Sequence, residues 1–179
     1  LHTVARLTWP VRLASGQVVE ASVQGYTGEY VVEGAPIRAL GRGAAVTPAG
    51  TRAAGETAGQ RDQRLGATFV YYPQPFGFQA EWNWGEGPGL NDRQTAVGVR
   101  PLHGGYAMVL WKHDTHGNGV VTPYARWAYY KGGYRSFANA PYGSHEQLDL
   151  GVEWQIRREM ELTLEYSLVD GVNLNPVNQ

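Results

Sequence analysis

The sequence predicts an all-β fold, an antiparallel up-and-down transmembrane β-barrel, and three observations favour it. Apolar and polar residues alternate along much of the chain, as they do on strands whose two faces meet different surroundings. Short and long connections alternate between these segments, which is typical of transmembrane barrels. Aromatic residues make up 12% of the chain, with 11 Tyr and 6 Trp, and both types are enriched where a membrane meets water.

The composition excludes several functional classes. The net charge of -1, from 15 Lys and Arg against 16 Asp and Glu, argues against a dedicated nucleic-acid binder. The absence of Cys excludes disulfides, thiolate metal sites and cysteine nucleophiles. No apolar run approaches the roughly twenty residues of a membrane-spanning helix. The sequence therefore leaves either a soluble all-β domain or a transmembrane β-barrel.

About eight strands are expected from the period-two pattern. In residues 160–168 the apolar side chains stand at even positions, with Glu161, Thr163 and Glu165 between them, so one face is apolar and the other polar. Residues 105–113 are apolar on both sides, and the sequence does not assign their faces. Strands are predicted over residues 4–13, 18–31, 66–72, 76–84, 105–113, 121–131, 148–156 and 160–168.

The connections between these strands are expected to alternate in length over a single β-barrel region, residues 1–179. In an outer-membrane barrel, short turns face the periplasm and long loops the outside. Long extracellular loops are expected at about 33–64, 85–103 and 132–145, and short periplasmic turns at about 14–17, 73–75, 114–119 and 157–159. A soluble lipocalin-like barrel would show the same alternation with its faces reversed, and this alternative remains open.

The polar faces of the strands would line the interior of the barrel. Rings of Arg or Lys select anions and rings of Asp or Glu select cations. The basic candidates are outnumbered by acidic ones, so these charges do not predict anion selectivity by themselves, and cross-strand pairs that stiffen the wall are the structural interpretation. The candidate channel-lining residues are Arg6, Arg12, Glu20, Glu81, Arg126, Asp149, Glu153, Glu161 and Glu165.

Aromatic residues on the apolar faces are expected to form the membrane girdle. These are Trp9, Tyr71, Trp82, Trp84, Trp127, Tyr129, Trp154 and Tyr166. Catalysis is not expected. His113, Asp114 and His116 fall in a predicted tight turn that lacks the further ligand a zinc site needs. We therefore expect no enzyme activity, no metal and no cofactor.

The expected topology bears on the size of the barrel. If the short turns are periplasmic, the strand series begins and ends outside, whereas bacterial single-chain barrels place both termini in the periplasm. We therefore expect a fragment of a larger barrel. Eight strands close around packed side chains, and roughly sixteen are needed for an aqueous channel. A complete eight-stranded outer-membrane barrel with a structural or adhesive role is the alternative.

Four long strings carry a resemblance to a known family. They are YYPQPFGFQAEWNWGEG at 71–87, LHGGY at 102–106, TPYARWAYYKGGYRSFANAP at 122–141 and EQLDLGVEWQIRREMELTLEYSLVD at 146–170. In this order they resemble the phosphate-selective porin O/P family of Gram-negative outer membranes. The resemblance implies that the chain is most of the C-terminal half of a sixteen-stranded, homotrimeric porin, and that outer-membrane lipid and lipopolysaccharide surround it. It implies passive diffusion of small anions such as phosphate or polyphosphate; a general or cation-leaning porin is the alternative.

Overall fold

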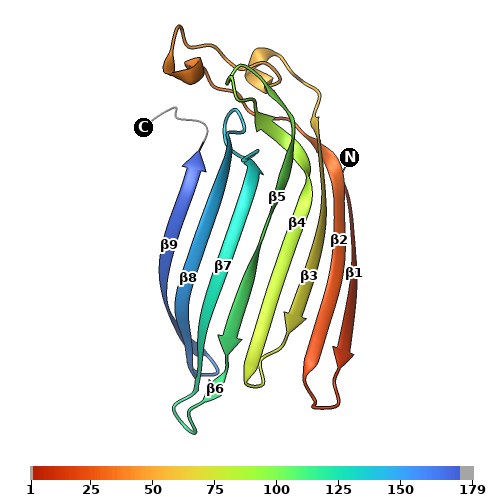
Figure 1. Ribbon diagram of the computed structural model, residues 1–179. Coiled ribbons are helices and arrows are strands. Elements are labelled where there is room, and N and C mark those ends of the chain that lie inside the picture. The colour runs from red at the N-terminus through yellow and green to blue at the C-terminus, as the bar shows by residue number, and fades with distance from the viewer. Residues whose placement is uncertain (1, 174–179) are drawn as a thin grey trace.

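The fold is a single layer of long β-strands with loops gathered at one end (Figure 1). The computed structural model describes residues 2–173. The long strands are β1 (Thr3–Arg12), β2 (Val18–Tyr30), β3 (Gln60–Tyr71), β4 (Phe76–Leu90), β5 (Val97–Trp111), β7 (Val120–Gly133), β8 (Tyr142–Arg157) and β9 (Met160–Asn173). The short elements are β6 (His113–Asp114) and two 3-10 helices, η1 (Ala39–Gly41) and η2 (Arg52–Ala54). In the described part of the chain, no helix is long and apolar enough to cross a membrane.

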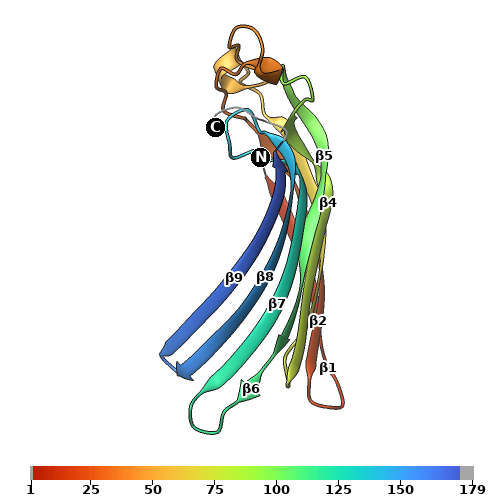
Figure 2. The same cartoon turned by 60° about the vertical axis from the view of Figure 1, so that its left-hand side comes forward.

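The strands form one antiparallel sheet in which each long strand pairs with the next along the chain. The spatial order is β1-β2-β3-β4-β5-β7-β8-β9, and β6 extends the pairing with β7. The sheet curves into an open trough, which Figure 2 shows from the side of β9. Over residues 2–173, β1 and β9 lie at the two edges. The prediction of an all-β, antiparallel, up-and-down sheet is confirmed.

The register assigns every strand position to one of two faces. Thr68, Glu81 and Tyr106 stand opposite one another on β3, β4 and β5, and this row belongs to the polar face. The faces of residues 105–113, which the sequence left open, are now assigned. Tyr106 and Met108 share the polar face, whereas Ala107 and Val109 share the apolar one.

The short turns lie where the sequence predicts them, but the loops at the opposite rim are shorter than expected. Loops are expected at 33–64, 85–103 and 132–145, and the structure has them at residues 31–59, 91–96 and 134–141. The glycine- and proline-rich run GEGPG resembles a loop in sequence, yet it continues β4. Gly85 is required there, because a Cβ at this position would lie 2.1 Å from the carbonyl oxygen of Gln63.

The buried apolar core lies at the long-loop rim, where the loops pack against the ends of β4 and β5, because a single-layered sheet encloses nothing along the rest of its length. Asn139, in the loop between β7 and β8, joins that loop to the start of 31–59. Its amide accepts from Ala35 N at 2.9 Å and donates to Ala35 O at 3.0 Å. The core cluster comprises Val32, Ile37, Leu90, Val97 and Ala140. The loops at this rim therefore form one packed cap over the ends of β4 and β5.

Candidate functional site

The apolar face of the sheet carries a broad band without charged side chains in the described strands. Leu164 is 72% exposed and Trp9 is 70% exposed, an arrangement that water does not favour. From Leu65 to Tyr71 on β3 the band covers six residue steps, about 20 Å along the strand at ~3.4 Å per residue, against the roughly 25 Å of a barrel's apolar belt. Charged residues bound the band at the long-loop rim: Arg61, Glu86, Lys131, Glu146 and Asp170.

All eight aromatic residues predicted for a girdle lie on this apolar face. Trp82, Trp127 and Tyr129 form a stack, with centroid separations of 6.1 Å for Trp82–Trp127 and 6.2 Å for Trp82–Tyr129. Tyr166 stands opposite Leu150, well inside its strand, and not at a strand end as the shorter predicted strands suggested. Phe76 stacks on Trp111 at the short-turn rim, with ring centroids 6.3 Å apart.

The nine residues predicted to line a channel share the opposite, polar face. Arg126 pairs directly with Asp149 across β7 and β8. Glu153, Glu161 and Glu165 lie on β8 and β9 toward the short-turn rim. The face therefore combines paired charges in its middle with acidic side chains near one rim.

Asp149 has the most complete set of hydrogen-bond partners on this face. Its Oδ2 accepts from Arg126 Nε at 2.8 Å and Nη2 at 2.7 Å. Its Oδ1 accepts from Ser167 Oγ at 2.6 Å and from Gln147 Nε2 at 2.7 Å. Asp149 is fully buried, whereas the side chain of Arg126 stays 40% exposed. The pair therefore presents its positive partner to solvent and keeps its negative partner inside the wall.

The remaining acids have weaker or neutral partners. Tyr124 Oη donates to Glu165 Oε2 at 2.5 Å, and its ring covers Gly151, where a Cβ would lie 2.3 Å from Tyr124 Cζ. Arg6 Nη2 lies 3.9 Å from Glu20 Oε1, at the limit of an ion pair. Within residues 2–173, Glu153 and Glu161 form no ion pair.

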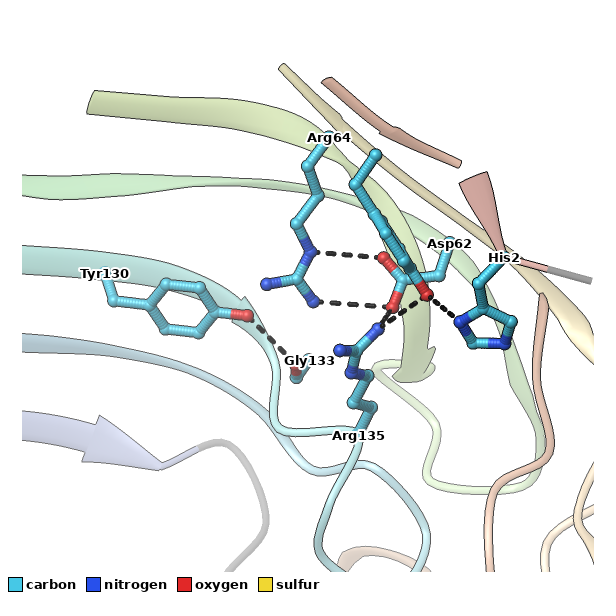
Figure 3. Close-up of polar contacts among 7 residues, drawn as sticks. His2, Asp62, Arg64, Tyr130, Gly133 and Arg135 are labelled. Carbon is cyan, nitrogen blue, oxygen red and sulfur yellow. Dashed lines mark hydrogen bonds and ion pairs between the residues drawn. The ribbon is translucent and has the colours of Figure 1, made fainter. Parts of the chain in front are cut away.

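A second charged cluster lies close to the long-loop rim, and the sequence analysis missed it (Figure 3). Asp62 is fully buried and accepts from Arg64 Nε at 3.1 Å, and Arg135 pairs with its other oxygen. The guanidinium of Arg135 also lies 5.0 Å from the ring centroid of Tyr30. Asp62 and Arg64 lie on β3, Arg135 lies in the loop after β7, and Tyr30 ends β2.

The missed cluster had a detectable signal. The expected long loop 33–64 includes residues 60–64, and this places Asp62 and Arg64 outside the expected wall. The even-numbered polar face of β3 runs from Thr68 back through Gly66 to Arg64 and Asp62, and extending that alternation would have found them. The position of Arg135 has no such signal, because a loop turns back onto the sheet only in the tertiary structure.

No metal centre is found in the described part of the chain, where no group of three or more His, Asp or Glu side chains could hold an ion. His113, Asp114 and His116 stay on the turn around β6, and Asp114 Oδ1 accepts from the backbone of His116 at 2.9 Å. This contact orders the turn.

Comparison with known protein families gives a match over nearly the whole chain. The model of a family described as phosphate-selective porin O and P matches residues 2–176, nearly the whole chain. Neither the comparison with curated proteins nor that with solved structures gives a match. The matched region contains the whole described sheet, including both charged clusters.

Proposed function

The chain belongs to the phosphate-selective porin O and P family, and from this premise we propose that the polar face of its sheet lines a channel that passes small anions, phosphate among them. Members of this family are outer-membrane porins of Gram-negative bacteria, so the chain is part of a channel protein located in that membrane. Transport would be passive: pore width and wall charge select the solute, and no bond is made or broken.

The exposure of the paired charges carries this proposal. In the Arg64–Asp62 pair the arginine is 30% exposed and the aspartate is fully buried. The Arg126–Asp149 pair shows the same asymmetry, with 40% against none. Counted by residues, each of these pairs has no net charge. Because only the arginine of each pair is exposed, a solute in the channel contacts a guanidinium group and not the carboxylate. Arginine also matches phosphate geometry, because its fork of donors can bind two oxygens at once.

We propose that the open sheet is about half of a sixteen-stranded barrel. Within residues 2–173 its two edges, β1 and β9, each present unpaired backbone groups, which cannot remain unpaired in lipid. Further strands would close the sheet and widen it to an aqueous pore. In this arrangement the long loops are extracellular, the short turns are periplasmic, the apolar band contacts lipid and lipopolysaccharide, and three copies associate.

This arrangement predicts that residues 1–179 alone do not give a stable barrel. Refolded into detergent micelles, residues 1–179 should show no monomeric species whose electrophoretic mobility changes on heating. The natural full-length gene product should show such a heat-modifiable species. A heat-modifiable monomer of residues 1–179 would show that the sheet closes on itself, and would favour the eight-stranded alternative.

A cation-leaning porin is the second candidate, and the acidic rim favours it. Glu153, Glu161 and Glu165 lie together on β8 and β9, and the first two form no ion pair in residues 2–173. An acidic ring at one end of a pore attracts cations. The two candidates differ in which group of charges controls permeation.

The reversal potential under a KCl gradient distinguishes them. We expect the natural full-length gene product in a planar bilayer to give a chloride-directed potential, and added phosphate to reduce the chloride current. A potassium-directed potential without block by phosphate would contradict the proposal and make the three glutamates the selectivity residues.

A further inference from the structure

The polar face contains a hollow of about 530 Å³ between Arg64 and Arg126. The floor of the hollow is formed by strand residues whose rows in the sheet lie between the row of Arg64 and the row of Arg126. Gly104 and Ala128 form part of this floor and have no long side chain to fill the hollow. A Cβ at position 104 would lie 2.4 Å from the carbonyl oxygen of Tyr129. The hollow is therefore built into the wall by residues without long side chains.

Both arginines are held in place before any solute arrives. Arg64 is fixed by buried Asp62 at 3.1 Å, and Arg126 by buried Asp149 at 2.7 Å. A fixed guanidinium loses little side-chain entropy when it binds an anion. The two ends of the hollow are thus prepared for anionic groups.

The middle of the hollow has different chemistry. Glu81 Oε1 accepts from Asn83 Nδ2 at 2.8 Å, and both side chains line the hollow together with His145. A carboxylate between two arginines repels a bare inorganic anion, but it accepts hydrogen bonds from hydroxyl groups. An amide beside it offers both donors and an acceptor.

Two tyrosines supply apolar surface beside these polar groups. Tyr106 and Tyr130 line the hollow, and Tyr130 Oη donates to Gly133 O at 2.9 Å (Figure 3), which restricts its ring. A sugar ring has an apolar C–H face that packs on an aromatic ring, and a rim of hydroxyls that needs planar polar partners.

We propose that this hollow binds a polyhydroxylated organic anion of the hexose phosphate class. The phosphate group of the ligand binds at Arg64 or Arg126, at one end of the hollow. Its hydroxyl groups bind at Glu81 and Asn83, and its sugar ring packs on Tyr106. The volume lies within the range of small-molecule sites. This inference rests on the proposed anion channel and assigns it a solute beyond inorganic phosphate.

The test compares current block by glucose 6-phosphate with block by inorganic phosphate, using the natural full-length gene product in a planar bilayer. Glucose 6-phosphate should block at a concentration about tenfold lower, since each added hydrogen bond to a charged group contributes this order of affinity. Glu81→Gln should weaken block by glucose 6-phosphate and leave block by phosphate equal or stronger, because it removes a hydroxyl acceptor and a negative charge together.

Glu153→Gln is the matched control, because it makes the same change on the same face outside this hollow. It should leave the ratio of the two blocking concentrations unchanged. Tyr106→Ala is the second variant and should weaken only the block by glucose 6-phosphate. A chloride-directed reversal potential with no preference for glucose 6-phosphate would overturn this inference and leave the proposed function standing. A potassium-directed potential would overturn the proposed function itself.

Discussion

Replacing Leu164 by arginine should prevent most of the natural full-length porin from assembling in a membrane. Leu164 lies on the apolar face of β9 and is 72% exposed, midway between the short-turn rim and Asp170. An arginine facing lipid near the middle of a bilayer costs about 2–4 kcal/mol in a transmembrane barrel. The heat-modifiable fraction after refolding into lipid vesicles measures the loss.

Thr163→Arg is the matched control for this change. Thr163 precedes Leu164 and points to the polar face, opposite Glu153, where an arginine finds water and a carboxylate. It should assemble as well as the wild type. Equal assembly of both variants would contradict the assignment of the apolar face to lipid, and loss of assembly only in Thr163→Arg would place the polar face, and not the apolar one, against lipid.

Removing Arg126 should reduce both stability and anion preference, and a second substitution should separate the two effects. In Arg126→Gln the fully buried carboxylate of Asp149 loses its cationic partner, which costs about 1–3 kcal/mol. Asp149→Asn in the same chain removes the uncompensated charge. The double variant should recover most of the unfolding free energy in denaturant titrations in micelles.

The double variant should not recover the anion preference. Its reversal potential in a planar bilayer should move toward zero, as in Arg126→Gln, because no guanidinium remains at this point of the wall. Asp149→Asn alone keeps Arg126 and should keep the preference. Full recovery of the chloride-directed potential in the double variant would show that Arg126 only stabilises the wall.

Much of the polar face could be predicted because a strand encodes its faces locally. In 148–156 the alternation places Asp149 and Glu153 on one side and Leu148 and Leu150 on the other, and the structure keeps this division. The local pattern is misleading over residues 85–90, where glycine and proline predict a loop but the chain continues β4. There, close contact between neighbouring strands requires glycine, and this contact is not visible within one segment.

The sequence by itself determined the strand class, the division of the apolar and polar faces and the positions of the short turns, because a period of two and turn residues act over a few neighbours. Only the tertiary structure decided which charges meet. Asp149 is saturated by side chains from three strands, and Asp62 is reached by Arg135 from a distant loop. Register and loop packing bring these groups together. The same two factors determine that the arginine, and not the aspartate, faces the solvent in the Arg126–Asp149 and Arg64–Asp62 pairs.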